Sequence, residues 1–395
     1  MQSIERQSQR NQHGGILFLL SSLIVGGSER KAIALANTLF ARGWDVRIAY
    51  IDAPERSPQA LMEMIAEGVP VFCLGRRGKY SVPALLRLAR YLKQHPIARL
   101  VTVNLHPLVY AIPAVLTPGV ARPRLVSMVN TMYSHKAGPG VMPFYGRLLR
   151  HADHAIFGSR SQMQSWIDVN AVDPSAATCI YNGIDLARFP RPTPKMVGER
   201  AAAEDQAPKH FTVGTVAQLR PEKNLRELLT ATAQLIQAGK PIHVLIIGDG
   251  PERPALEAFA SAMGIHEHVT FVGQVDDVRP YLAAMDVFVL TSIVETFSNA
   301  ALEAMAMGRP VVLSRVGGAA EMVTPGVEGY LYTSGHPEEL AVAVDQTLAD
   351  DAKRKAIGEN ARQRVEQQFS WDRMVKDYEN VIGVGPTATA VQRAW

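Results

Sequence analysis

Residues 287–313 have the sequence VFVLTSIVETFSNAALEAMAMGRPVVL, and this stretch decides the fold class. Its two apolar runs, residues 287–290 and 311–313, have the length of buried strands, and a helical pattern lies between them. A buried strand, a helix and a second buried strand in succession are typical of a parallel sheet covered by helices on both faces. The stretch therefore predicts an α/β protein.

The same alternation recurs on both sides of this stretch. Further strands are predicted at residues 16–20, 46–50, 100–103, 125–129, 212–217, 243–247 and 269–272. Helices are predicted at residues 28–40, 83–94, 225–238 and 254–263, the first of them with Ser28 as N-cap and Gly43 as C-terminal glycine.

A proline-rich, polar segment at residues 190–208 interrupts the alternation and predicts a linker. The sequence thus predicts two α/β domains, residues 1–190 and 191–395. The C-terminal helix is a candidate to cross back to the first domain.

Composition is that of a globular chain, with 395 residues, 47% hydrophobic and 20% charged. No run of 18 apolar residues occurs, so no membrane-spanning helix is predicted. Residues 16–25 follow Arg6 and Arg10 and resemble the core of a secretory signal, but the helix that follows favours a first buried strand. Cys73 and Cys179 form neither a disulfide framework nor a metal knuckle, which predicts a cytoplasmic location.

Charge is distributed unevenly between the two halves. Residues 1–190 carry a net charge of +10 and residues 191–395 a net charge of −6, which gives the overall +4. Residues 68–152 contain twelve Lys and Arg and no acidic residue. This asymmetry favours a polyanion or an anionic membrane surface as a partner of the first half, the alternative being a solvated basic face.

Several polar or glycine-rich segments follow predicted strands, where ligands bind in open parallel sheets. Gly26 and Gly27 would let the backbone approach a ligand at a helix N-terminus. Arg220 and Lys223 place two cations at a strand exit, suited to a pyrophosphate. Read alone, the glycine pair could be an ordinary turn and the cations ordinary surface charges.

The most specific of these segments is the pair of carboxylates Glu295 and Glu303. Seven residues separate them, and the start of a helix lies between them. Carboxylates bind vicinal hydroxyls, and helix N-terminal amides bind phosphate. The arrangement therefore suits a nucleotide sugar, with one carboxylate at the ribose and the other at the hexose. A second glycine turn follows at residues 317–318.

Together these residues resemble the retaining glycosyltransferases of family 4, which have the GT-B architecture. Seven segments of the second half match in order: 179–185, 220–223, 248–251, 271–273, Glu295 with Glu303, 308–312 and 317–321. The first half matches more loosely at residues 26–29 and 151–159. The resemblance implies two Rossmann-like domains that face each other across a cleft, the first for the acceptor and the second for the donor.

The resemblance also implies roles for individual residues. Arg220 and Lys223 would neutralise the donor diphosphate in place of a metal, Glu303 would bind the ribose, and Glu295 the transferred sugar. Catalytic roles are thereby assigned to Glu295, Lys223, Arg220 and His106, and donor binding to Gly26, Gly27, Gly248, Val275, Phe297, Ser298, Asn299 and Glu303. The chain has no D-x-D motif, so no metal cofactor is expected.

One position departs from the family pattern. Many members have a sugar-contacting histidine after the strand that corresponds to residues 125–129, where this chain has Asn130. His106 and His135 are the nearby substitutes, and His106, directly after a predicted strand, is the better placed.

The expected activity is therefore that of a retaining hexosyltransferase. It would move a sugar from a UDP- or GDP-sugar to a lipid-linked or saccharide acceptor in cell-surface polysaccharide or lipopolysaccharide synthesis, and association with the inner face of the cell membrane is expected. An epimerase of the same architecture is the alternative enzyme, although the intact pair Glu295 and Glu303 argues against it. A nucleic-acid-binding protein is the alternative from another class, but the aromatic residues of 68–152 show no repeated spacing for base stacking.

Overall fold

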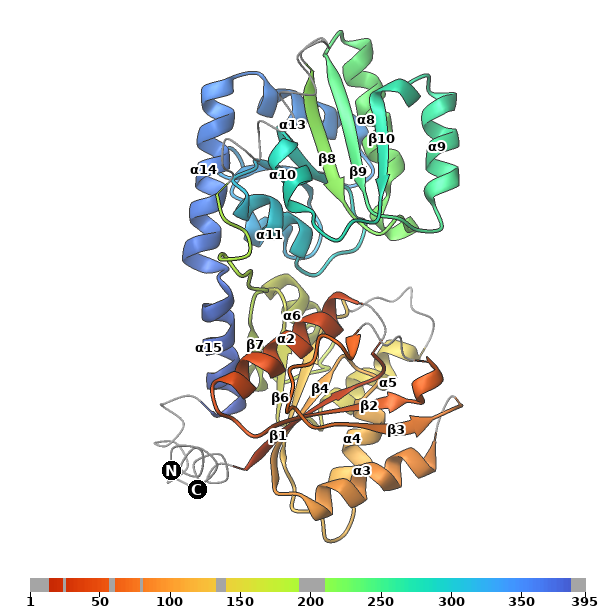
Figure 1. Cartoon of the computed structure of the whole chain (residues 1–395), viewed down its shortest axis with the longest axis vertical. Coiled ribbons are helices and arrows are strands. Elements are labelled where there is room, and N and C mark those ends of the chain that lie inside the picture. The colour runs from red at the N-terminus through yellow and green to blue at the C-terminus, as the bar shows by residue number, and fades with distance from the viewer. Residues whose placement is uncertain are drawn as a thin grey trace. The chain divides into compact units, whose positions relative to one another are not determined.

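The computed structural model of the chain describes residues 14–23, 26–56, 61–78, 81–132, 140–191 and 210–384. The chain forms two compact units (Figure 1). Unit 1 contains the residues up to Ile180 and those from Val375 onward, and unit 2 is Tyr181–Met374. Most of the predicted linker, residues 192–208, lies outside the described residues.

Unit 1 is built on a seven-stranded sheet in the order β3-β2-β1-β4-β5-β6-β7. Its strands are β1 (Gly15–Leu20), β2 (Val46–Asp52), β3 (Val71–Arg76), β4 (Ile97–Val103), β5 (Arg124–Val129), β6 (His154–Phe157) and β7 (Ala177–Cys179). Its helices are α2 (Gly27–Ala41), α3 (Val82–Gln94), α4 (Leu108–Val115), α5 (Val141–Leu149), α6 (Arg160–Ile167) and the end of α15 (Trp371–Ile382). Helix α4 contacts both α3 and α5, and all three helices contribute residues to one hydrophobic core cluster.

Unit 2 is built on a six-stranded sheet in the order β10-β9-β8-β11-β12-β13. Its strands are β8 (Phe211–Val216), β9 (Ile242–Ile247), β10 (Val269–Gly273), β11 (Val287–Leu290), β12 (Val311–Ser314) and β13 (Gly329–Tyr332). Its helices are α8 (Leu225–Gln237), α9 (Arg253–Ala262), α10 (Arg279–Ala284), α11 (Asn299–Ala306), α12 (Ala319–Met322), α13 (Pro337–Leu348) and α14 (Asp351–Gln368).

Every strand pair in both sheets is parallel. The carboxyl ends of all strands of a sheet therefore lie at the same edge. In each unit the second and third strands lie on one side of the first strand, and the later strands lie on its other side. The strand order therefore reverses between β1 and β4 and between β8 and β11. Ligands of open α/β sheets bind at such reversals.

The predicted fold class, with two Rossmann-like parallel-sheet domains, is confirmed. All nine predicted strands are present within a few residues of their expected bounds. Strands β3, β6, β7 and β13 were not predicted, because they are either half-buried or only three to four residues long. Short runs of this kind give little periodicity to detect.

The N-cap of helix α2 lies two residues earlier than predicted. Its N-cap is Gly26 and not Ser28, which lies in the first helical turn, and no side chain caps the helix. The prediction of Ser28 as N-cap is therefore wrong, since the chain is already helical at Gly27. Gly43 does end the helix, with a φ of +95° and its N–H donating to the carbonyl of Phe40.

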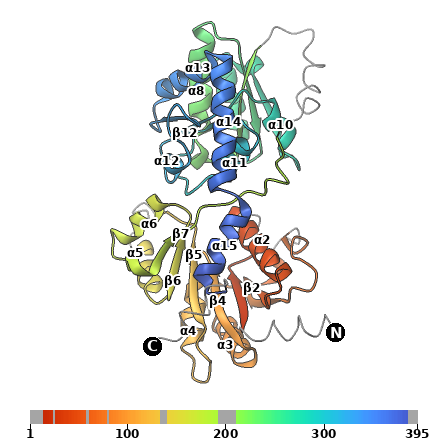
Figure 2. The same ribbon diagram turned by 90° about the vertical axis from the view of Figure 1, so that its left-hand side faces the viewer.

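Helix α15 begins in unit 2 and ends in unit 1, where buried contacts hold it. Arg99 on β4 is buried and donates from Nε to the carbonyl of Ile382 (3.1 Å) and from Nη2 to the carbonyl of Gly383 (2.7 Å). Arg42, at the end of α2, pairs with Glu379 at 2.8 Å. Within unit 1, α15 and α2 lie side by side (Figure 2). Of the helices described, none has the length and apolar character needed to cross a membrane.

Candidate functional site

Two loops at the strand reversal of unit 2 carry the central predicted residues. One loop follows β8 and contains Arg220 and Lys223, and the other follows β11 and contains Glu295. Because β8 and β11 are parallel neighbours, both loops leave the same edge of the sheet side by side. Residues that are 72 positions apart in sequence are thereby brought together.

The structure joins Lys223 and Glu295 in an ion pair. Lys223 Nζ lies 2.8 Å from Glu295 Oε2, and the two side chains are 23% and 20% exposed. An ion pair that keeps this contact with solvent contributes about 1 kcal/mol or less. A ligand can therefore reach and rearrange both groups at little cost.

The backbones of the two loops are also connected. Thr291, which is buried, donates from its hydroxyl to the carbonyl of Lys223 (2.7 Å). The N–H of Ile293 donates to the carbonyl of Glu222 (2.9 Å). Arg220 precedes the 3₁₀ turn Pro221–Lys223 and is exposed, and no ion pair involves its side chain in the part of the chain that the structure describes. Its guanidinium is available to an anion.

Glycines allow the neighbouring turns to pack directly against these loops. A Cβ on Gly248, whose φ is +122°, would overlap the carbonyl oxygen of Ala217, and one on Gly250 would overlap that of Leu219. The turn after β9 thus rests directly on the segment that leads to Arg220. Gly248 has this packing role whether or not its backbone also contacts a ligand.

Gly317 has the corresponding position beneath Glu295. Its φ is +51°, and a Cβ there would overlap the carbonyl oxygen of Glu295. The N–H of Gly318 donates to the carbonyl of Thr296 (2.8 Å). The glycine turn after β12 therefore fixes the backbone at Glu295, and no other amino acid fits without moving it.

The predicted segment 297–299 forms the start of α11. Ser298 is the N-cap, and its hydroxyl accepts from the N–H of Ala301 (3.3 Å). Phe297 is buried and stacks on Tyr181, with ring centroids 5.0 Å apart. Since these two side chains are engaged in the fold, it is the backbone amides here that could meet a ligand.

Asn182 is a residue whose role the sequence did not reveal. Its side-chain amide donates to the carbonyl of Phe297 (2.9 Å) and to Asn299 Oδ1 (3.0 Å). Asn182 thus holds the start of α11 from a segment more than a hundred residues away in sequence. The matching segment 179–185 was the available signal, but it did not indicate a contact.

The two remaining donor-site residues of unit 2 lie on other elements. Glu303 is half-buried in α11. Val275 follows β10, the edge strand, and packs against the core cluster that contains Phe297. Their roles stay predictions.

In unit 1 the predicted residues lie at the reversal between β1 and β4. Gly26 caps α2 with an ordinary extended φ of −147°, and Gly27 is exposed. Residues 24 and 25, which precede this glycine pair, lie outside the described residues, as does His135.

His106 belongs to a chain of half-buried polar contacts. Its Nε2 lies 3.2 Å from Arg76 Nη1 and its Nδ1 3.4 Å from Ser21 Oγ, while Arg76 Nε donates to Asp52 Oδ1 (2.6 Å). An arginine can only donate, so Nε2 accepts and Nδ1 carries the proton. Burial, followed by the charge of Arg76, lowers the pKa of His106 below its usual value. Both ring nitrogens of His106 are thus engaged with neighbouring side chains.

Asn130 follows β5 directly, at the position where many family members have a histidine. Its Oδ1 accepts from Lys31 Nζ at 3.0 Å. Burial lowers the pKa of Lys31 to about 8. The chain thus places an amide that is bonded to a lysine, and no imidazole, at this position.

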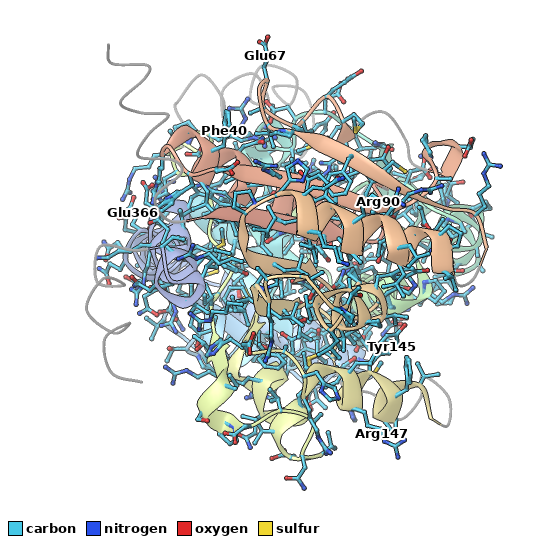
Figure 3. All side chains as sticks on the ribbon, turned by 90° about the horizontal axis from the view of Figure 1, so that it is seen from below. Phe40, Glu67, Arg90, Tyr145, Arg147 and Glu366 are labelled. Atoms are coloured by element: carbon cyan, nitrogen blue, oxygen red, sulfur yellow. The ribbon has the colours of Figure 1, made fainter. Side chains whose placement is uncertain are left out.

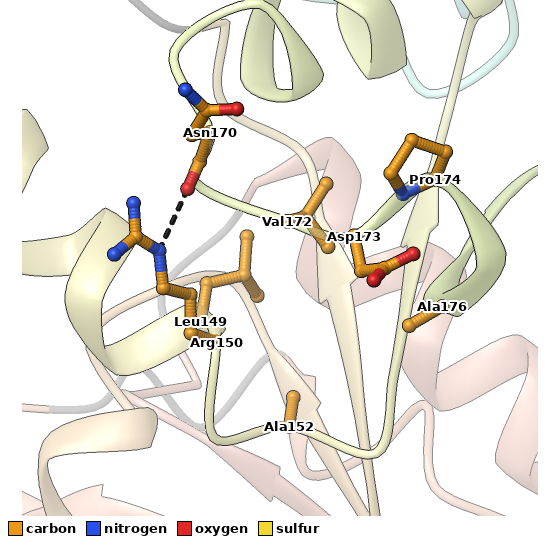
Figure 4. A pocket seen from close by; sticks show the side chains of 8 residues that line it. All are labelled: Leu149, Arg150, Ala152, Asn170, Val172, Asp173, Pro174 and Ala176. Carbon is orange, nitrogen blue, oxygen red and sulfur yellow. Dashed lines mark hydrogen bonds between the residues drawn. The ribbon is translucent and has the colours of Figure 1, made fainter.

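A pocket of about 400 Å³ lies elsewhere in unit 1 (Figure 4). Its walls come from the segments before β6 and before β7, and Arg150 Nε donates to the carbonyl of Asn170 at its rim (2.7 Å). These segments lie at the amino ends of the strands, the edge opposite to the predicted site residues. Within the described ranges, no group of three or more His, Cys, Asp or Glu could hold a metal ion.

Sequence comparison gives two family matches that together span most of the chain. The profile of glycosyl transferases group 1 matches residues 199–364, and that of glycosyltransferase family 4 matches residues 25–188. The chain belongs to glycosyltransferase family 4. The resemblance inferred from the seven segments is confirmed.

Curated glycosyltransferases are among the relatives of this family 4 chain. It is 34% identical to the lipopolysaccharide core biosynthesis glycosyltransferase LpsE of Rhizobium meliloti, over 42% of this chain and 47% of LpsE. It is 26% identical to N-acetyl-alpha-D-glucosaminyl L-malate synthase of Bacillus anthracis, over 90% of this chain and 93% of that protein. The match to LpsE thus spans about half the length of that relative.

Among solved structures, Anabaena Alr3699/HepE shares the fold. Its complex with UDP has a TM-score of 0.82 at 23% identity, covering 93% of this chain and 99% of that one. Its complex with UDP-glucose has a TM-score of 0.80 at 24% identity, covering 94% and 99%. These similarities establish the GT-B fold.

The glycine turn beneath Glu295 gives a first prediction. Gly317→Ala should destabilise the chain by about 3 kcal/mol or more, because the new methyl overlaps the backbone carbonyl of Glu295 in addition to the cost of a positive φ. Gly326→Ala is the matched control, since Gly326 has a φ of +82° with open space around its Cβ position, and it should cost about 1 to 2 kcal/mol. Urea unfolding of both variants measures the difference, and equal losses would show that Gly317 does not support Glu295.

Proposed function

We propose that the protein is a retaining glycosyltransferase that moves a hexose from a nucleoside diphosphate donor to a lipid-linked or saccharide acceptor. The observation that carries this proposal is the pairing of Lys223 with Glu295 at the strand reversal of unit 2. A cation suits a diphosphate and a carboxylate suits sugar hydroxyls, so this pair supports a nucleoside diphosphate sugar as the donor. The exposed Arg220 adds a second cation on the same loop.

The charges account for the chemistry of the proposed transfer. When the bond between the sugar and the diphosphate breaks, negative charge grows on the departing phosphate oxygen. Lys223, Arg220 and the amides at the start of α11 stabilise that charge, and each well-placed donor lowers the barrier by about 3 kcal/mol. Because two cations lie on one loop, we propose that no metal ion is needed.

Glu295 would serve the sugar side of the reaction. Its carboxylate orients the hexose through hydroxyl contacts and stabilises the positive charge that develops at the anomeric carbon. Glu303 would hold the ribose. We infer retention of the anomeric configuration, by attack on the face from which the diphosphate leaves, from family membership.

The relatives support a sugar nucleotide donor and a cell-surface product. HepE was crystallised with UDP and with UDP-glucose, so a UDP-sugar is the first donor to test and a GDP-sugar the second. LpsE acts in lipopolysaccharide core biosynthesis, which fits a lipid-linked saccharide acceptor at the cytoplasmic face of a membrane.

The direct test is nucleoside diphosphate release from a panel of UDP-, GDP- and ADP-sugars, measured in excess EDTA. We expect release from at least one donor, because cationic side chains take the place of a metal. Complete loss of turnover in EDTA with recovery on adding manganese or magnesium would contradict metal independence. Absence of release from every donor, with and without metal, would contradict the proposed transfer.

Substitutions at the site should have different kinetic effects. Lys223→Ala should lower kcat about 100-fold or more, because its contact strengthens as the diphosphate departs. Glu295→Gln should lower kcat steeply with little change in donor affinity, since the amide keeps the size and most hydrogen bonds. Glu303→Ala should raise the donor KM more than it lowers kcat, because ribose contacts barely change during the reaction.

These effects are measured as donor kcat and KM, with nucleoside diphosphate affinity by calorimetry. Lys240→Ala is the matched control for the lysine, since Lys240 pairs with Asp345 on another part of unit 2 and should leave both parameters unchanged. Turnover of Glu295→Gln at the wild-type rate would show that Glu295 is not at the reacting sugar.

We also propose that unit 1 binds an anionic membrane surface through the outer sides of α3 and α5. Large apolar side chains are exposed there beside cations, and Arg90 on α3 and Arg147 on α5 mark this side in Figure 3. The basic face consists of Val82, Leu86, Arg90, Lys93, Val141, Phe144, Arg147 and Arg150. Apolar groups that enter the lipid interface, combined with cations worth about 1 kcal/mol each, are typical of peripheral binding.

Reversing charge on the basic face should release the protein from vesicles. Wild type should sediment with vesicles of anionic lipid at low salt and detach at high salt, and Arg90→Glu with Arg147→Glu should weaken the binding at least tenfold, because about 2 kcal/mol of attraction is lost. Lys376→Glu on α15, outside the basic face, is the control. Equal recovery of wild type with neutral and anionic vesicles would contradict the membrane proposal.

A further inference from the structure

A buried carboxylate lies beside the loop that carries Lys223. Glu227 is the third residue of α8 and only 5% exposed, and the next two residues, Leu228 and Leu229, are buried as well. Its Oε2 accepts from Asn224 Nδ2 (2.5 Å), and its Oε1 accepts from the N–H of Gly335 (2.7 Å). A carboxylate is costly to bury unless such bonds satisfy it, and an apolar side chain of similar size would pack there at lower cost.

Both oxygens of Glu227 are therefore committed to defined partners. Burial raises the pKa of Glu227, and the hydrogen bonds from Gly335 and Asn224 act against that shift. The carboxylate connects two loops, the one after β8 and the one between β13 and α13, whose residues are 108 positions apart. A residue that served packing alone would not need these contacts.

Asn224 is the link from Glu227 to the site. It follows Lys223 directly and has a left-handed backbone, with φ 48° and ψ 44°, where it ends the 3₁₀ turn and begins α8. Its side chain does not cap the helix but donates to Glu227, whose own N–H donates back to the carbonyl of Asn224 (3.0 Å). These reciprocal bonds fix the turn on which the direction of Lys223 depends.

Lys223 is consequently held by two contacts that involve the buried residues Thr291 and Glu227 and by one accessible contact. Thr291 fixes its carbonyl, the bonds between Asn224 and Glu227 fix the residue after it, and Glu295 pairs with its ammonium. A ligand anion would alter only the last of these. The other two contacts would keep the lysine in place through the reaction, which is what preorganised charge stabilisation requires.

We propose that Glu227 is a positioning residue that aims Lys223 at the donor diphosphate. The inference rests on the proposed function, because it assigns to Glu227 a share in the same diphosphate contact. It predicts a selective defect. Loss of Glu227 should weaken the recognition of a diphosphate and leave the recognition of the rest of the nucleotide intact.

The test compares the affinities of UDP and UMP by calorimetry, with GDP and GMP in parallel. Glu227→Gln keeps the size of the side chain but presents an NH₂ group to one of two donors, so one bond is lost. We expect the variant to bind the diphosphate about tenfold more weakly, as for the loss of one hydrogen bond at a fixed charge. Affinity for the monophosphate should stay within about twofold of wild type.

Two further variants keep the result interpretable. Asn224→Gly removes the link to Glu227 while a glycine still adopts the left-handed turn, and it should reproduce the selective loss. Glu328→Gln is the control, because Glu328 is equally buried in unit 2 and accepts from the N–H of Thr324 (2.7 Å) and from Arg364 (3.1 Å). It should lower the unfolding temperature without changing either affinity.

The outcomes separate the two proposals. A loss confined to the diphosphate in Glu227→Gln and Asn224→Gly supports the positioning role. Equal losses of affinity for diphosphate and monophosphate would mean that Glu227 only supports the fold. Unchanged affinities would mean that Glu227 does not act on Lys223. Either result overturns the inference and leaves the proposed function standing. Failure of the wild type to bind any of the nucleotides would overturn the proposed function itself.

Discussion

The reversal of strand order between β8 and β11 is the constraint on which the site depends. Two parallel neighbours end at the same edge, and the helices that follow them return on opposite sides of the sheet, so the two loops lie side by side at that edge with their polar groups accessible. The loop after β8 supplies cations and the loop after β11 supplies a carboxylate. The ion pair of Lys223 and Glu295 is the direct result of this topology.

The neighbouring strands then determine how rigid these loops are. The turns after β9 and β12 flank the reversal, and both contain glycines whose missing side chains allow backbone to rest on backbone. Gly248 supports the approach to Arg220, and Gly317 supports Glu295. The backbone that carries the accessible charges is thus closely packed and has almost no freedom to move. The charged side chains themselves are free to exchange partners.

Much of this arrangement could be predicted from the sequence, because central strands such as 287–290 are continuous apolar runs and the loops after them carry charge. The pairing of Lys223 with Glu295 could not, since spacing along the chain does not say which loops are neighbours. Glu227 was missed for a related reason. A glutamate in the first turn of a helix ordinarily faces water, and its partner Gly335 is remote in sequence. Ser28 was misplaced because the residues around a helix start offer several possible caps.

The position of α15 has a consequence for the synthesis of the chain. Unit 2 is one continuous segment, Tyr181–Met374, inserted into the sequence of unit 1. Val375, Tyr378 and Ile382 are buried in unit 1. Arg99 in β4 donates hydrogen bonds to the carbonyls of residues 382 and 383, which lie in the part of this unit that is synthesised last. A domain folds as a unit once its whole sequence has left the ribosome. Unit 2 can therefore complete its fold while unit 1 still lacks its last helix. Unit 1 begins first in the sequence but is the second to have all its residues available.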